Sequence, residues 1–128
     1  MRFVLTLLFL FFATGGSALG QDKKKPEPCA DAQTQTDINI CWGNEYKAAD
    51  AQLNKTYQQL VALLDAAERN QLKNVETAWI KYRDANCDFV ADQYKGGSMR
   101  PMIYALCMAD VTTNRTTELK QQIEDRNH

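Results

Sequence analysis

The stretch CDFVADQYKGGSMRPMIYALC, residues 87–107, has a cysteine at each end and two adjacent glycines near its middle. Gly96 and Gly97 are expected to end a helix, because glycine is unfavourable inside helices and favoured just beyond their ends. In an antiparallel helix pair, residues equidistant from the turn lie side by side. Gly97 is the midpoint between Cys87 and Cys107. The stretch therefore predicts a helical hairpin closed by a Cys87–Cys107 disulfide.

Helices on both sides of this turn are predicted from the spacing of apolar residues. The helix before the turn ends ahead of residues 95–98, and the residues expected to face its core are Leu72, Val75, Trp79, Tyr82 and Phe89. The helix after the turn covers about residues 99–124, with Ser98 as its N-cap and Pro101 in its first turn. The residues expected to face inward there are Met102, Ile103, Leu106, Leu119 and Ile123, and the middle of this helix is polar.

A longer helical pattern precedes the hairpin, over about residues 31–67. Thr36 or Asp37 is expected to cap its packed part, and a shift in the pattern places a break within residues 65–70. Its apolar stripe recurs at steps of three or four residues and consists of Cys41 or Trp42, Tyr46, Ala49, Leu53, Tyr57, Leu60 and Leu64. Strand-like alternation does not appear. The sequence thus predicts an all-α fold, a three-helix antiparallel arrangement with two disulfides.

The two remaining cysteines, Cys29 and Cys41, are expected to form the second disulfide and to fasten the N-terminal segment onto the first helix. An even number of cysteines in a short exported chain is typical of a disulfide framework. A metal site is disfavoured, because the sequence has no C-x-x-C pair and its only histidine is the terminal His128. We expect neither a metal nor another cofactor.

The N-terminus has the features of an export signal. One arginine precedes an uncharged apolar run too short to span a bilayer, and Ala18-Leu19-Gly20 follows as a cleavage site. We interpret residues 1–20 as a signal peptide, residues 21–30 as a flexible lead-in, and residues 31–128 as one helical domain. The mature protein is then periplasmic or secreted, with no membrane span after the signal is removed.

The charge balance excludes one class of partner. Without residues 1–20 the chain has 14 basic and 16 acidic side chains, a net charge of −2. Nucleic-acid binding requires a strongly basic face, so it is excluded. A mildly acidic chain is compatible with a cationic protein partner.

The stretch AWIKYRDANC, residues 78–87, concentrates the candidate functional side chains. Trp79, Arg83 and Cys87 share one helix face, so Arg83 is expected to stack on Trp79. Catalysis by Cys87 is disfavoured, because an oxidised cysteine is not a nucleophile and no histidine lies near it to act as a base. The three carboxylates that follow at a spacing of four form either a solvated face or a partner-facing acidic line: Asp84, Asp88 and Asp92.

The order of these segments resembles the LprI lysozyme-inhibitor family of exported bacterial proteins, over about residues 29–123. The matching residues are Leu53, Asn54, Tyr57, Trp79, Arg83, Asp84, Gly96, Gly97, Pro101, Thr113, Arg115, Leu119 and all four cysteines. One departure lies in VETAWI, residues 75–80, where the family commonly has glutamine or arginine just before the Ala-Trp pair. The resemblance implies a helical exported domain, lysozyme inhibition and no catalytic residues.

We therefore expect a non-enzymatic inhibitor of lysozyme-type muramidases that binds and occludes their active cleft. The alternative is a non-catalytic module of the bacterial envelope that binds another protein. In the first case the expected partner is a cationic lysozyme. The residues expected to face the partner are Trp79, Tyr82, Arg83, Asp84, Asp88 and Asp92.

Overall fold

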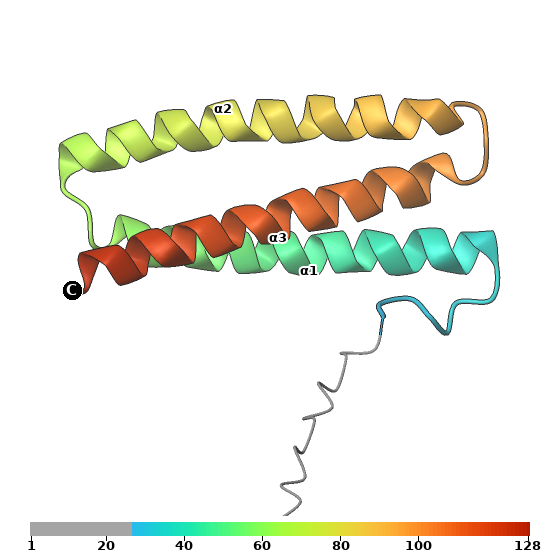
Figure 1. The fold of residues 1–128 in the computed structure, drawn as a ribbon, viewed down its shortest axis with the longest axis horizontal. Coiled ribbons are helices and arrows are strands. Elements are labelled where there is room, and N and C mark those ends of the chain that lie inside the picture. Colours follow the sequence, from blue (N-terminus) through green and yellow to red (C-terminus); the bar gives the residue numbers. More distant parts are fainter. Residues whose placement is uncertain (1–26) are drawn as a thin grey trace, which may run out of the picture.

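Three antiparallel α-helices make up the fold of the computed structural model, which describes residues 27–128. They are α1 (Gln35–Val61), α2 (Ala66–Ala91) and α3 (Arg100–Arg126), and a short 3₁₀ helix, η1 (Asp92–Tyr94), follows α2 (Figure 1). The predicted all-α, three-helix fold is confirmed. The predicted signal peptide, residues 1–20, and residues 21–26 of the predicted lead-in 21–30 lie outside the described residues.

The helix boundaries differ from the prediction in their capping residues. Thr34, not Thr36 or Asp37, caps α1, and its hydroxyl accepts a hydrogen bond from the Asp37 amide. The first break falls earlier than expected, because α1 already ends at Val61. Asp65 then starts α2 with a reciprocal capping box to Glu68. In contrast, Ser98 is not the cap of α3, which begins after Met99 with no side-chain cap.

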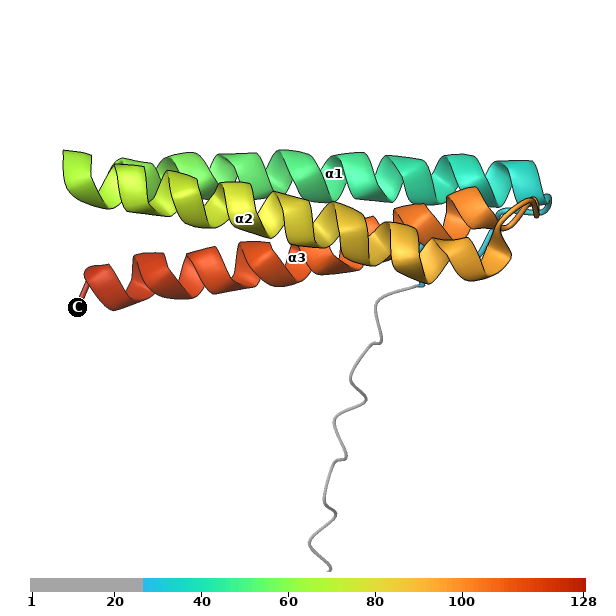
Figure 2. The same cartoon turned by 90° about the horizontal axis from the view of Figure 1, so that it is seen from above.

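The closest packing is between α1 and α3, which run side by side, whereas α2 stands farther from this pair at its N-terminal end (Figures 1 and 2). Buried threonines allow α1 and α3 to approach closely. The hydroxyls of Thr56 and Thr116 donate to the carbonyl oxygens four residues earlier, at 3.0 Å in both cases. Both hydroxyls are therefore satisfied within their own helices, which allows them to be buried, whereas the equally buried hydroxyl of Thr112 has no hydrogen-bond partner among the described residues.

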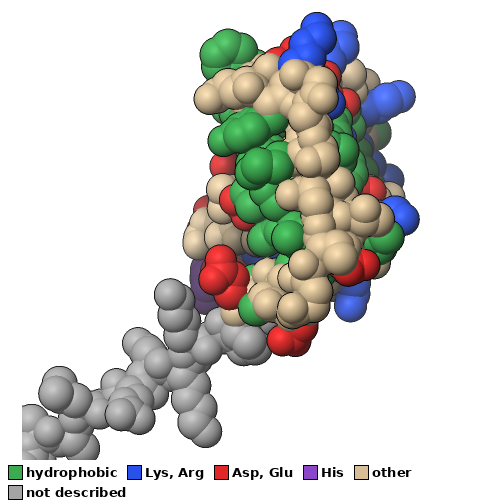
Figure 3. All heavy atoms as spheres, turned by 90° about the vertical axis from the view of Figure 1, so that its right-hand side faces the viewer, with side chains coloured by type: hydrophobic (Ala, Val, Ile, Leu, Met, Phe, Trp, Pro, Cys, Tyr) green, Lys and Arg blue, Asp and Glu red, His purple; other side chains and the backbone are tan. Residues whose placement is uncertain are grey.

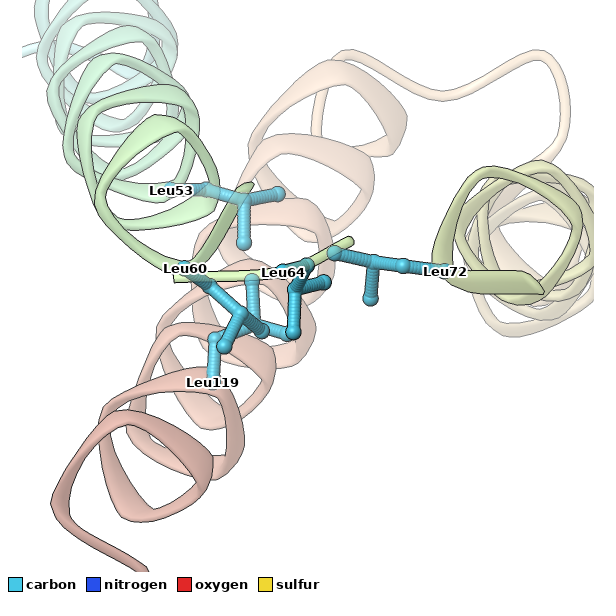
Figure 4. Packing of buried hydrophobic residues seen from close by; sticks show 5 residues of the cluster. All are labelled: Leu53, Leu60, Leu64, Leu72 and Leu119. Carbon is cyan, nitrogen blue, oxygen red and sulfur yellow. The ribbon is translucent and has the colours of Figure 1, made fainter. Parts of the chain in front are cut away.

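A leucine cluster closes the interior at the end of the bundle opposite the glycine turn. Its buried members come from all three helices and the α1–α2 turn, and Leu72 reaches the cluster from α2 (Figure 4). The cluster consists of Leu53, Leu60, Leu64, Leu72 and Leu119. These five residues confirm part of each predicted apolar stripe.

The predicted inner face of α2 is wrong for three of its residues. Val75, Tyr82 and Phe89 are exposed, Phe89 by 76% of its surface. The buried residues of α2 lie on a face rotated away from these positions, and they are Leu72, Glu76, Arg83, Cys87 and Ala91. In α3, the fully buried positions are likewise mostly small or polar, and Met102, Ile103, Leu106 and Ile123 are only half-buried. Ionic and stacking interactions of the buried charges, described below, are the physical reason for the rotation of α2.

Both predicted disulfides are confirmed. Cys29 is joined to Cys41 and Cys87 to Cys107, with Cα–Cα distances of 5.8 and 5.5 Å. Gly96 has a φ of +82° in the turn before α3, a conformation that glycine adopts without strain. Among the described helices, none is long and apolar enough to cross a membrane.

Candidate functional site

The Arg83 side chain lies between α2 and α1, among the candidate functional side chains of α2. Only 7% of Arg83 is exposed. Its guanidinium carbon lies 5.1 Å from the centre of the Trp79 ring and 5.6 Å from that of Tyr46. The predicted stacking of Arg83 on Trp79 is therefore confirmed, and a second aromatic ring from α1 extends it.

Two carboxylates balance the charge of Arg83. The Nε atom of Arg83 donates to the Asp84 carboxylate at 2.9 Å, and its Nη1 atom lies 3.6 Å from a carboxylate oxygen of Asp50 in α1. Burial raises the pKa of Tyr46 above its ordinary value, and the nearby Arg83 cation opposes part of this rise. These contacts hold α2 against α1, so the buried Arg83 side chain positions the exposed residues of α2.

A groove with a volume of about 250 Å³ runs between α1 and α2 beside this group. It is lined by both apolar and charged side chains, which are Asp50, Leu53, Asn54, Tyr57, Lys73, Glu76, Thr77, Trp79, Ile80 and Arg83. The groove lies on the side where α2 stands apart from the α1–α3 pair (Figure 1).

A buried ion pair joins α2 to α3 at the base of this groove. Arg115 Nε donates to Glu76 at 2.8 Å, and another Arg115 nitrogen donates to Glu118 at 2.6 Å. Burial lowers the pKa of Arg115, but the hydrogen bonds to Glu76 and Glu118 outweigh it, so the net shift is upward. The sequence interpretation missed this pair, because Glu76 lies outside the apolar stripe predicted for α2.

The acidic line at the end of α2 is partly neutralised by the start of α3. One Arg100 nitrogen donates to Asp88 at 3.0 Å and to Asp92 at 2.8 Å. These two carboxylates remain about half-exposed, as does Asp84. The Tyr82 ring, with 61% of its surface exposed, lies on the outside of the same helix.

The structure thus divides the six candidate partner-facing residues into two groups. Trp79 and Arg83 point toward α1 and contact the interior, whereas the accessible residues are Tyr82, Asp84, Asp88 and Asp92. Hydrophobic side chains reach the surface at the end of the molecule that carries the turn, with charged groups around them (Figure 3). The sequence interpretation did not identify Phe89 as a surface residue. Its spacing of seven from Tyr82 places both residues on the same face of the helix, and this spacing can be read from the sequence.

A second acidic surface was not anticipated from the sequence. A hollow of about 490 Å³ between α1 and α3 is bordered by Glu27, Glu45 and Asp110, with Trp42 among its apolar lining residues. Across residues 27–128, 15 acidic and 11 basic side chains give a net charge of −4. The described part of the protein therefore carries more net negative charge than residues 21–128 taken together, whose net charge is −2.

Two kinds of catalytic group, a metal-binding cluster and a free thiol, are absent from the described residues. In the described part of the chain, no group of three or more His, Cys, Asp or Glu side chains has an arrangement that would hold a metal ion. All four cysteines are oxidised, which removes the only thiol nucleophiles.

Comparison with known proteins finds a matching family and two similar proteins. The lysozyme inhibitor LprI family matches residues 27–119. Uncharacterized protein R02472 of Rhizobium meliloti (strain 1021) is 41% identical over 115 residues, which cover 79% of this chain and 83% of that protein. Uncharacterized protein YecT of Escherichia coli (strain K12) is 26% identical over 113 residues, which cover 70% of this chain and 67% of that protein. No solved structure matches.

Proposed function

Since the chain belongs to the lysozyme inhibitor LprI family, we propose that it is an exported, non-catalytic protein that binds a lysozyme-type muramidase and occludes its active cleft. Such enzymes act through two carboxylates in a cleft, and animal-type lysozymes are cationic. A binder that excludes substrate from the cleft needs a rigid surface and associates faster if that surface is acidic. The disulfide-tied helices supply the rigidity.

The proposed contact surface is the accessible side of α2 near the glycine turn. The observation that carries this assignment is an exposed aromatic ring, Tyr82, on the helix that also presents the half-exposed carboxylates of Asp84 and Asp88. The half-exposed Asp92 follows directly, at the start of η1. Tyrosine is among the residue types that most often anchor protein interfaces. Trp79 and Arg83 have a positioning role beneath this surface, because they fix α2 against α1.

The test is inhibition of cell-wall lysis by a cationic lysozyme, measured together with association rates at several salt concentrations. Asp84→Asn, Asp88→Asn and Asp92→Asn in one variant remove three negative charges and keep hydrogen-bonding groups for Arg83 and Arg100. This variant is expected to associate more slowly than the wild type. The matched control removes three exposed charges elsewhere: Asp31→Asn, Glu124→Gln and Asp125→Asn.

The control separates local contacts from net charge. If both variants slow association equally, the effect is one of net charge, and the assignment to α2 is wrong. Wild-type association should also slow as salt rises, because salt screens exposed charges. If the wild type inhibits none of the animal, goose and phage types of lysozyme at micromolar concentration, the proposed function fails, and a non-catalytic envelope-binding module is the better description.

A further inference from the structure

The outer face of α2 carries an apolar row with no partner in the described chain. Val75, Ala78, Tyr82, Ala85 and Phe89 are all exposed, and their spacing alternates between three and four residues. We call these five residues the outer stripe. This alternation is the pattern with which helices pack along one another, because it keeps the apolar positions on one seam. Half or more of the surface of Val75, Tyr82 and Phe89 is exposed.

We propose that the outer stripe is a self-association surface, on which α2 packs antiparallel against α2 of a second copy of this chain. Large and small residues alternate along it, so an antiparallel arrangement centred between Tyr82 and Ala85 is self-complementary. Tyr82 then lies over the partner's Ala85, and Phe89 lies over the partner's Ala78. A two-fold axis repeats each of these contacts in the opposite sense.

Charge complementarity selects the same arrangement. Lys81 and Asp88 lie beside the stripe on one flank, both exposed. In the antiparallel register, Lys81 of one copy lies opposite the partner's Asp88, and the symmetry axis repeats this ion pair. Arg100 binds only the Oδ1 atom of Asp88, so the other carboxylate oxygen remains available. In a parallel pairing the flank that carries Lys81 would face the partner's other flank, so Lys81 would not meet the partner's Asp88.

The size of the stripe predicts a weak dimer. Aromatic side chains bury about 150–250 Å² each, so the four rings of a two-fold pair contribute roughly 600–1,000 Å². Stable protein interfaces bury about 1,200–2,000 Å² in total. The dissociation constant is therefore expected to be on the order of 10–100 µM.

Self-association would also regulate the proposed inhibitory surface, a consequence that rests on the proposed function. Tyr82 belongs to both surfaces, so a dimer covers a residue that the muramidase would contact. Dissociation at low concentration would expose it.

Sedimentation of the oxidised mature protein, residues 21–128, tests the self-association without any muramidase. The weight-average mass should rise from monomer toward dimer between about 5 µM and 500 µM. The double variant Tyr82→Glu, Phe89→Glu should remain a monomer throughout. The control Ile40→Glu, Leu63→Glu changes two exposed apolar residues outside the stripe by the same charge and should associate as the wild type does.

The register has its own test. Lys81→Asp alone and Asp88→Lys alone should each weaken the dimer at least tenfold, because each places like charges opposite one another. The combined variant should recover most of the affinity. A wild type that stays monomeric up to about 500 µM overturns the proposal. Loss of muramidase binding in the Tyr82→Glu, Phe89→Glu variant of such a monomer would identify the muramidase as the occupant. A dimer that the charge exchange does not restore overturns the antiparallel register.

Discussion

Removal of the Glu76 carboxylate is the sharpest test of how α2 is held to the rest of the molecule. The Glu76 and Arg115 side chains are 11% and 9% exposed, so the pair is little screened by solvent. Removing one partner of a buried ion pair generally costs about 3–5 kcal/mol, because the remaining charge stays buried without compensation. Arg115 retains its hydrogen bond to Glu118, which offsets part of this loss. We therefore expect Glu76→Ala to lower the free energy of unfolding by about 2–4 kcal/mol.

The assay is urea unfolding of the oxidised mature protein, followed by circular dichroism at 222 nm. Glu118→Gln is the matched control, since the Glu118 side chain is 60% exposed and its ion pair should contribute less than about 1 kcal/mol. The double variant Glu76→Leu, Arg115→Met replaces both charges by apolar groups of similar volume. It should recover most of the loss seen in Glu76→Ala, because no buried charge remains unpaired.

Two results would refute this reasoning. A loss of less than about 1 kcal/mol in Glu76→Ala would mean that water reaches Arg115 through the groove. A double variant that is as unstable as the sum of its two single variants would show that the two side chains do not interact. Either outcome would mean that α2 lies farther from α3 in solution than it does in the structure.

Three further predictions follow from individual features. The double variant Cys87→Ser, Cys107→Ser should lose about 2–5 kcal/mol of stability in the same unfolding assay, and a loss below this range would mean that the helix packing alone fixes the turn. Burial raises the pKa of Tyr46 above its ordinary 10.0 in the folded state, so the unfolded chain releases this proton first as pH rises. This contribution to stability is present below pH 10.0 and declines above it, and the decline should be smaller in Tyr46→Phe when urea midpoints at pH 8 and about pH 11 are compared. Intact-mass measurement of the exported protein should show a chain that starts near Gln21, whereas a mature species that retains Met1 would contradict the signal-peptide interpretation.

The sequence was sufficient to predict the elements that depend on local chemistry. The glycine turn, the three helices and the pairing of Cys87 with Cys107 all follow from residue type and spacing within about 20 residues. The stacking of Arg83 on Trp79 is local in the same sense, because residues four apart on a helix are neighbours.

The orientation of α2 depends on tertiary contacts and was not predictable from periodicity. The rule that the apolar face of a helix points inward places Val75 and Phe89 in the core, yet both are exposed. The inward face instead buries Glu76 and Arg83, whose partners lie on α3 and α1, about 40 residues away along the chain. Charged residues are buried only when they are paired, and a single helix shows no sign of its partners. The wrong assignment of Val75, Tyr82 and Phe89 to the core was the direct result.

Both disulfides lie in the half of the molecule that contains the glycine turn and the start of α1 (Figure 1). The opposite half has no disulfide, and apart from the α1–α2 turn its helices are held together by noncovalent contacts, among them the leucine cluster and the Arg126–Glu68 ion pair at 3.8 Å. Local opening should therefore begin at that noncovalent end, near Asp65, and stop at Cys87. Amide hydrogen exchange along α2 is expected to slow progressively from its first turn toward Cys87, because the disulfide to Cys107 keeps that part of α2 against α3 while the first turns separate.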